Sequence, residues 1–156
     1  MLRVEIPGRG ELVLAHVVLD FNGTFACDGR ILPGVAGRLR ALAGDLNVHI
    51  LTADTFGTAQ EACREVGGEV VVLREPVTGP EKASYVEKLG AGSTVAIGNG
   101  ANDAPMLRRA ALGIVVVGPE GAAVEAVQAA DIVVREINDA LDLLLKPKRL
   151  VATLRC

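Results

Sequence analysis

An apolar run that ends abruptly at an acid constrains the fold of this chain more than any other stretch. Residues 17–19 are branched aliphatic residues, and Asp20 follows them directly. A run without polar alternation is typical of a buried strand in a parallel sheet. Gly23 then allows the backbone to turn sharply. Because ligands of open α/β sheets bind beyond the carboxyl ends of the strands, Asp20 is predicted to lie at a functional site.

The rest of the chain alternates between short apolar runs and helical patterns. Further strands are predicted at 48–51, 70–73, 95–97, 114–117 and 132–134, and helices at 33–43, 57–66, 80–89, 102–110 and from about 121 and 137. Strands that alternate with helices predict a parallel sheet with right-handed crossovers. The expected fold class is therefore α/β, a single-domain Rossmann-like three-layer sandwich, and 156 residues fit one domain.

The two ends of the chain extend this core. Residues 1–14 predict a β-hairpin around a Pro/Gly turn, residues 15–145 form the core, and residues 146–156 form a C-terminal tail. The apolar segment Leu150–Leu154 is interpreted as a further strand that pairs with the hairpin or extends a neighbour's sheet. Hairpin and tail together predict an unusually apolar surface, so we expect a homo-oligomer.

Composition excludes several classes of function. The net charge is −3, and Lys146, Lys148 and Arg149 are expected to form a solvated helix end, so no basic stripe indicates nucleic-acid binding. No apolar run approaches the length of a membrane span, and the N-terminus lacks the apolar core of a signal peptide. The three cysteines lack metal-ligand spacing, which favours a reduced, cytoplasmic protein. His16 and His49, without a partner at ligand spacing, are expected to be packed strand residues.

Three later stretches have candidate catalytic or ligand-binding residues at strand ends or helix starts. Thr52 ends a predicted strand, where its hydroxyl and the following amides suit a phosphoryl oxygen, although a capping role is the better interpretation for Asp54 and Thr55. Lys82 begins a helix, a position that the helix dipole disfavours for a cation; the alternative is a solvated lysine. Asp103 ends a glycine-rich turn and offers the hard oxygen that Mg²⁺ prefers, or else caps the next helix.

Together these stretches resemble the four ordered motifs of the haloacid dehalogenase (HAD) superfamily, and most closely the phosphorylation domain of P-type ATPases. Leu-Thr-Ala-Asp at 51–54 differs by one residue from the Leu-Thr-Gly-Asp of those ATPases, and 98–103 matches Gly-Asp-Gly-x-Asn-Asp except at Asn99. The resemblance covers roughly residues 17–144. Only 27 residues separate Thr24 from Thr52, which leaves no room for the ATPases' inserted nucleotide-binding domain. The chain therefore resembles capless, soluble P-type ATPase-like proteins and is not expected to be an ATP-driven pump.

The resemblance implies a role for each matching residue. Asp20 would attack a phosphoryl group and become an aspartyl-phosphate, with Mg²⁺ as cofactor and a small phosphorylated substrate or a phosphoprotein as partner. The implied sets are catalytic Asp20, Asn22, Thr52 and Lys82; phosphate-binding Gly23, Thr52, Ala53, Lys82 and Asn102; and metal-binding Asp20, Asn22 (through its carbonyl), Asn99 and Asp103.

Two departures from the family pattern bear on activity. Most HAD phosphatases carry a general acid/base Asp where this chain has Asn22, and an amide cannot take a proton from water near neutral pH. Asn99 replaces an Asp that binds Mg²⁺ in the ATPases. We therefore expect a slow Mg²⁺-dependent phosphatase. The alternatives are a phosphoryl-accepting or phosphate-binding regulatory module and a catalytically inactive interaction protein.

Overall fold

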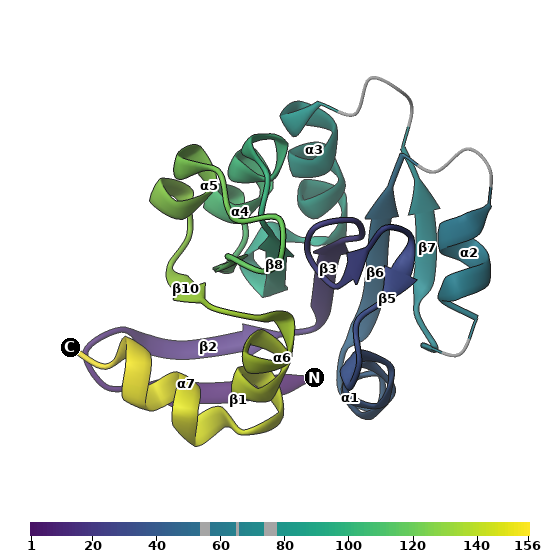
Figure 1. The fold of residues 1–156 in the computed structure, drawn as a ribbon. Helices are drawn as coiled ribbons and strands as arrows, with labels where there is room; N and C mark the ends of the chain where they lie inside the picture. Colours follow the sequence, from purple (N-terminus) through teal and green to yellow (C-terminus); the bar gives the residue numbers. More distant parts are fainter. Residues whose placement is uncertain (54–56, 65, 74–77) are drawn as a thin grey trace.

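A six-stranded parallel sheet forms the centre of the computed structural model, which describes residues 1–53, 57–64, 66–73 and 78–156 (Figure 1). The strand order is β10-β9-β8-β3-β6-β7. The bounds are β3 (His16–Asp20), β6 (Asn47–Thr52), β7 (Glu69–Val72), β8 (Thr94–Gly98), β9 (Leu112–Val116) and β10 (Ile132–Val134). β3 lies between β6 and β8, and all its neighbours run parallel to it. The predicted α/β class and the central position of the 17–19 run are confirmed.

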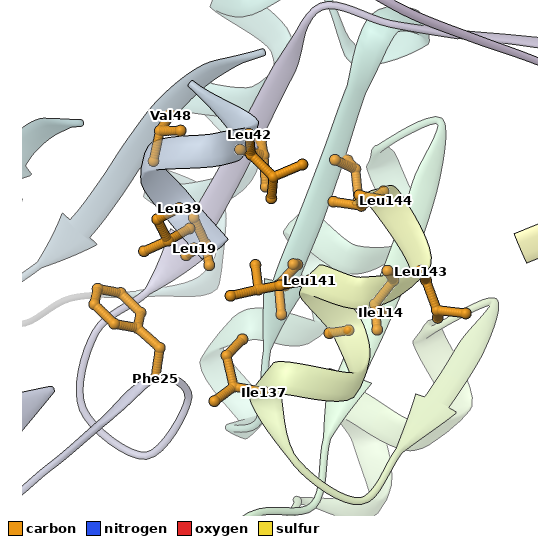
Figure 2. Close-up of a cluster of buried hydrophobic side chains, with 14 of the residues drawn as sticks. Leu19, Phe25, Leu39, Leu42, Val48, Ile114, Ile137, Leu141, Leu143 and Leu144 are labelled. Atoms are coloured by element: carbon orange, nitrogen blue, oxygen red, sulfur yellow. The ribbon is translucent and has the colours of Figure 1, made fainter. Parts of the chain in front are cut away.

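Helices cover both faces of this sheet and make it the middle of three layers. They are α1 (Val35–Leu42), α2 (Thr58–Ala62), α3 (Gly79–Leu89), α4 (Ala104–Arg109), α5 (Val124–Ala129), α6 (Ile137–Leu145) and α7 (Pro147–Leu154). Side chains alternate across a strand, so Val17 and Leu19 of β3 join the core beneath α1 and α6, whereas Val18 joins the core beneath α3, α4 and α5. Figure 2 shows the first core, where leucines of α1 and α6 face each other.

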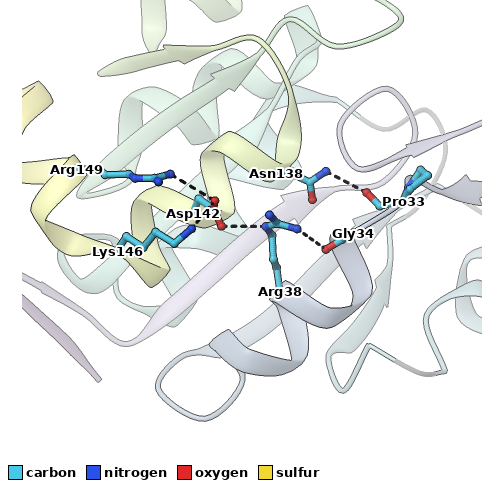
Figure 3. Close-up of polar contacts among 7 residues, drawn as sticks. All are labelled: Pro33, Gly34, Arg38, Asn138, Asp142, Lys146 and Arg149. Carbon is cyan, nitrogen blue, oxygen red and sulfur yellow. Dashed lines mark hydrogen bonds and ion pairs between the residues drawn. The ribbon is translucent and has the colours of Figure 1, made fainter.

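An ion-pair cluster fixes the C-terminal helices to α1 (Figure 3). Arg38 Nε lies 2.9 Å from Asp142 Oδ1, and Asp142 Oδ2 accepts from Lys146 and Arg149. Hydrogen bonds from Arg38 and Lys146 lower the pKa of Asp142 to about 2. Lys146 and Arg149 are thus paired at this junction and do more than form a solvated helix end.

The interpretation of the C-terminal tail as a strand was wrong. Residues 147–154 form helix α7, which Pro147 opens at a position where its missing amide proton is not needed. Leu150 and Leu154, one turn apart, are buried in the same core as Val4 and Leu14 of the hairpin β1 (Leu2–Ile6) and β2 (Gly10–Leu14). Figure 1 shows α7 lying along this hairpin. Hairpin and tail cover each other, so exposed apolar strands no longer argue for self-association, and the homo-oligomer stays an untested prediction.

Two further details separate the structure from the sequence-based expectation. The loop after Thr24 contains a small hairpin, β4 (Ala26–Cys27) and β5 (Arg30–Ile31), that was not predicted. The capping interpretation of Asp54 and Thr55 lies outside the described residues. Within the described part of the chain, no helix is long and apolar enough to cross a membrane.

Candidate active site

Three charged side chains from separate elements meet at the carboxyl end of β3. Lys82 Nζ lies 2.7 Å from Asp20 Oδ1 and 2.6 Å from Asp103 Oδ1. Asp20 ends β3, Lys82 belongs to the first turn of α3, and Asp103 closes the 3₁₀ turn η2 (Ala101–Asp103) after β8. The parallel sheet brings these strand ends to one edge, which is why residues 62 and 21 positions apart can share one ammonium group.

Asp103 is held on both of its oxygens. Its Oδ1 accepts a hydrogen bond from Lys82 Nζ. Its Oδ2 accepts hydrogen bonds from the backbone N–H groups of Asn99 and Gly100, each at 2.9 Å. The side chain is fully buried, and a Cβ on Gly98 would lie 2.5 Å from its carboxyl carbon. Asp103 therefore positions Lys82 and closes the turn. Of the two carboxylates, Asp20 is the one that lines the cleft.

The cluster carries more negative than positive charge. Burial raises the pKa of Asp20 to about 6, and repulsion from Asp103 adds to this shift, while attraction and a hydrogen bond from Lys82 oppose it. Burial by itself would lower the pKa of Lys82, but attraction to Asp20 and Asp103 raises it, so the ammonium stays protonated. Two carboxylates facing one ammonium make the site receptive to a further cation.

Thr24 connects Asp20 with Asn99. Its buried hydroxyl lies 3.5 Å from Asp20 Oδ2 and 3.3 Å from Asn99 Oδ1, and its single proton serves one of them at a time. Asn99 Nδ2 donates to the carbonyl of Gly121 at 3.1 Å, so the amide oxygen is the atom turned toward Thr24. No role was predicted for Thr24, although its place in the first motif was a usable signal.

A cleft of about 330 Å³ opens beside Asp20. Residues assigned to the site from sequence that line it are Asp20, Asn22, Thr52, Ala53, Lys82, Asn99 and Asn102. Gly23 and Asp103 are buried behind these residues. Phe21, Gly100 and Glu120 complete the lining and were not predicted. Glu120 follows β9 in a Gly-Pro-Glu-Gly loop, and no motif pointed to it.

Asn22 has a structural contact of its own. Its Oδ1 accepts a hydrogen bond of 3.2 Å from the backbone N–H of Gly29, in the turn between β4 and β5. Asp28 and Gly29 have φ angles of 51° and 74°, which suits a tight turn at this place. The amide at position 22 therefore holds the small hairpin next to the cleft.

The donor set fits a hard cation that keeps part of its water. In the described ranges no group of three His, Cys, Asp or Glu side chains forms a metal cage. The side-chain oxygens at the cleft include the carboxylates of Asp20 and Glu120 and the amides of Asn22, Asn99 and Asn102. Mg²⁺ is commonly held by one or two carboxylates, with water and substrate phosphate completing its octahedron.

A second polar cluster lies at the opposite end of the sheet. His16, which begins β3, has its Nδ1 3.1 Å from His49 Nε2. His49 Nδ1 lies 3.0 Å from the Tyr85 hydroxyl and 3.5 Å from Glu69 Oε2. Burial, and then His16, lower the pKa of His49. The histidines are packed as expected, and Glu69 of β7 is a carboxylate neighbour that spacing in the sequence did not indicate.

Comparison with known proteins identifies relatives by similarity of sequence. No protein-family model matches the chain. An uncharacterized protein of Methanocaldococcus jannaschii is 57% identical over 61 residues, which cover 39% of this chain and 66% of that protein. A copper-exporting P-type ATPase of Staphylococcus saprophyticus is 32% identical over 98% of this chain but only 18% of its own length. The chain thus spans about two thirds of one relative and about a fifth of the other.

Solved structures with a similar fold come from phosphatases and hydrolases. The 3-deoxy-D-manno-octulosonate 8-phosphate phosphatase of Moraxella catarrhalis, solved with magnesium, phosphate and its sugar, superimposes with a TM-score of 0.72. It is 17% identical, and the match covers 91% of this chain and 94% of that one. A putative HAD family hydrolase of Streptomyces avermitilis has a TM-score of 0.69 at 21% identity, covering 86% and 87% of the two chains.

Proposed function

Because this chain has the fold of the haloacid dehalogenase superfamily and a sequence similar to that of P-type ATPases, we propose that it is a magnesium-dependent phosphohydrolase with Asp20 as its nucleophile. The observation that carries the proposal is the contact of Lys82 with Asp20 and Asp103 at the carboxyl edge of the sheet. This arrangement places a carboxylate and a fixed positive charge together at the edge of an open cleft. A small phosphate ester fits this volume, and the ester is the proposed class of substrate.

Each residue then has a definite task. Lys82 holds Asp20 Oδ1, which leaves Oδ2 to attack phosphorus while the phosphorus–oxygen bond of the ester breaks. Lys82 and the end of β6 at Thr52 and Ala53 would bind the phosphoryl oxygens, whose charge needs donors fixed in advance. The leaving oxygen takes a proton from water. A second water then attacks the phosphorus of the aspartyl-phosphate and gives a proton to the hydroxide left by the first; the phosphorus–Asp20 oxygen bond breaks, which releases phosphate and restores the Asp20 carboxylate.

The proposed magnesium site uses Asp20, the Asn22 carbonyl and the Asn99 amide oxygen. When bound, the ion would offset the charge of the phosphoryl group and of Asp20. The Moraxella phosphatase of similar fold, solved with magnesium and phosphate, supports magnesium as the ion. Asp103 was expected to be a metal ligand, but both its oxygens are engaged, so we propose that it acts through Lys82 and the backbone amides of Asn99 and Gly100.

Hydrolysis of a generic ester such as p-nitrophenyl phosphate tests the proposal. We expect Mg²⁺-dependent release of phosphate from the wild type, loss of it in Asp20→Asn, and a mass increase of one phosphoryl group on Asp20 in the trapped protein. Asp28→Asn is the matched control, because it removes an exposed carboxylate nearby at a left-handed position that Asn accepts. Equal turnover by the wild type and Asp20→Asn would overturn the proposal.

The amide at position 22 makes a phosphoryl-accepting regulatory module the second candidate. Asn22 cannot remove a proton from water, so the phosphorylated state would persist and serve as the output. One burst of product followed by slow steady-state release favours this candidate over a rapidly turning phosphatase. A protein that neither hydrolyses esters nor accepts a phosphoryl group would be the inactive interaction protein considered from the sequence.

Replacing Asn22 by Asp tests whether the amide limits turnover. We expect steady-state turnover to rise by about 10²-fold or more, because general acid/base catalysis typically contributes 10²–10⁴-fold. An Asp keeps the acceptor for the Gly29 N–H, so the small hairpin should stay in place. The measurement is pre-steady-state kinetics, in which the burst of the wild type should disappear. Unchanged turnover in a folded, Mg²⁺-binding variant would show that Asn22 is not limiting.

A further inference from the structure

The carboxylate of Glu120 lies at the mouth of the proposed active site without a role in the mechanism above. It belongs to the loop that follows β9, and it lines the same cleft as Asp20 and Asn99. The Glu120 carboxylate lies directly against Gly23, whose φ is +82°. A Cβ built on Gly23 would lie 2.3 Å from Glu120 Oε2 and within 3 Å of the Asn99 side-chain amide. The first-motif turn therefore has no side chain where the Glu120 carboxylate and Asn99 approach it.

Asn99 holds the loop that carries Glu120. Its Nδ2 donates to the Gly121 carbonyl at 3.1 Å, and its own carbonyl accepts from the Ala123 N–H at 2.9 Å. At the start of the loop, the Gly118 N–H donates to the Arg135 carbonyl at 2.9 Å. An Asp at position 99 could not donate to Gly121. The amide that weakens the fourth motif as a metal ligand is thus the group that fixes this loop over the cleft.

The Glu120 carboxylate has no ionic partner among the described residues. Across residues 1–53, 57–64, 66–73 and 78–156, no ion pair or hydrogen bond engages its carboxylate. Asn22, Asn99 and Asn102, which line the same cleft, are neutral amides, and the Lys82 ammonium that also lines it is paired with Asp20 and Asp103. A carboxylate this close attracts a divalent cation most strongly where no neighbouring cation balances it.

We infer that Glu120 supplies, from the β9–α5 loop, the negative charge that Asn99 does not bring to the magnesium site, and that it does so through a water molecule of the ion. The inference rests on the proposed function, because it concerns the same site. An outer contact agrees with the finding that no three carboxylate, His or Cys side chains of the described residues form a direct cage. Mg²⁺ favours such contacts because it gives up its water reluctantly.

Titration calorimetry with MgCl₂ on the full chain, in the absence of substrate, tests this role. We expect Glu120→Gln to weaken Mg²⁺ binding by about tenfold at low ionic strength, and by less as salt is added, since the carboxylate is exposed. Glu5→Gln is the matched control: it makes the same change of charge at an exposed position in the N-terminal hairpin. Its dissociation constant should stay within about twofold of the wild type.

A second variant separates the effect of the Glu120 charge from any change in the conformation of the loop. Glu120→Asp retains the charge and should recover most of the Mg²⁺ affinity, and the melting temperature without metal should be the same in all three variants. Equal Mg²⁺ binding by Glu120→Gln and Glu5→Gln would overturn the inference. If the wild type binds Mg²⁺ with this dependence on Glu120 yet hydrolyses no ester, the inference stands and the proposed phosphohydrolase fails.

Discussion

The two ends of the central sheet both gather titratable side chains, but they balance charge in opposite ways. At the carboxyl end, two carboxylates, Asp20 and Asp103, share the single ammonium of Lys82. At the amino end, His16 and His49 lie against each other and against Tyr85, and burial keeps His49 neutral by lowering its pKa. The first cluster is buried and short of positive charge, whereas the second consists of neutral side chains with one carboxylate, that of Glu69, exposed at its edge. An unbalanced buried cluster indicates a ligand site, whereas a balanced one indicates packing.

The difference also has opposite consequences for stability against pH. The pKa of Asp20 is raised from 3.8 to about 6, so the folded state holds a proton there that the unfolded state has lost, and stability falls as pH rises from about 4 to 6. The lowered pKa of His49 means that the unfolded state takes up a proton first, so stability falls as pH drops below 6.5. The two ends therefore offset each other over part of the acid range.

Among the variants that test this contrast, Lys82→Met should have the largest effect on stability. It leaves Asp20 and Asp103 buried next to each other without a cation, so we expect a loss of about 3–5 kcal/mol in the free energy of unfolding at pH 7 to 8. Urea unfolding measures this loss. It should shrink toward pH 4, where a proton can replace the ammonium. Lys88→Met, an exposed lysine of the same helix, is the control and should change stability by less than about 0.5 kcal/mol.

A loss no larger than that of Lys88→Met would mean that the carboxylates are not held by Lys82. The contrast between the two ends of the sheet would then fail, because the carboxyl end would contain no coupled charge cluster.

Asp20→Asn should give the next largest effect, and with the opposite sign. Removal of the carboxylate leaves Lys82 and Asp103 as a balanced pair, so we expect the variant to be more stable than the wild type at pH 7 by about 1–3 kcal/mol. The gain should shrink toward pH 4, because Asp20 is then protonated in the folded chain and close to half protonated in the unfolded chain. Thermal unfolding from pH 4 to 8 measures it, with Asp28→Asn as control. A variant less stable than the wild type at pH 7 would contradict the charge imbalance.

His49→Gln should have the smallest effect on stability, and it tests the cluster at the amino end of the sheet. The loss of contacts with His16 and Tyr85 should cost about 1 kcal/mol at pH 8, the typical net contribution of a buried hydrogen bond. Below pH 6.5 the difference from the wild type should narrow, because the variant has no imidazole to protonate on unfolding. Equilibrium unfolding at pH 5.5 and 8 measures both values. A difference that widens at pH 5.5 would mean that His49 is charged in the folded protein.

Most of the fold was predictable because the chain is locally consistent. The apolar runs are short and bounded by turn residues, and parallel pairing places their carboxyl ends at one edge, which brought Asp20, Thr52 and Lys82 to one cleft. The tail is the exception. Its leucines at 150 and 154 have helical spacing after Pro147, but their apolar character alone was read as a strand.

The site was less predictable where a residue acts only through tertiary contacts. Nothing in the order of motifs places Glu120 against Gly23, because the approach depends on how the β9–α5 loop is held by Asn99. The pairing of His16 with His49 depends on the register between β3 and β6, which sequence patterns do not specify. The two-residue strands β4 and β5 are likewise too short to leave a periodic signal.

Helix α3 carries a consequence for how this protein can be observed. Lys82 and Tyr85 lie on it three residues apart, so the same helix contacts Asp20 at one end of the sheet and His49 at the other. The chain contains no tryptophan and a single tyrosine. Its near-ultraviolet emission therefore comes chiefly from one phenol, and making or breaking the hydrogen bond of that phenol to the His49 imidazole would change the emission. The wild-type protein thus has an unlabelled optical probe on the element that holds Lys82, ready for titration with metal or phosphate.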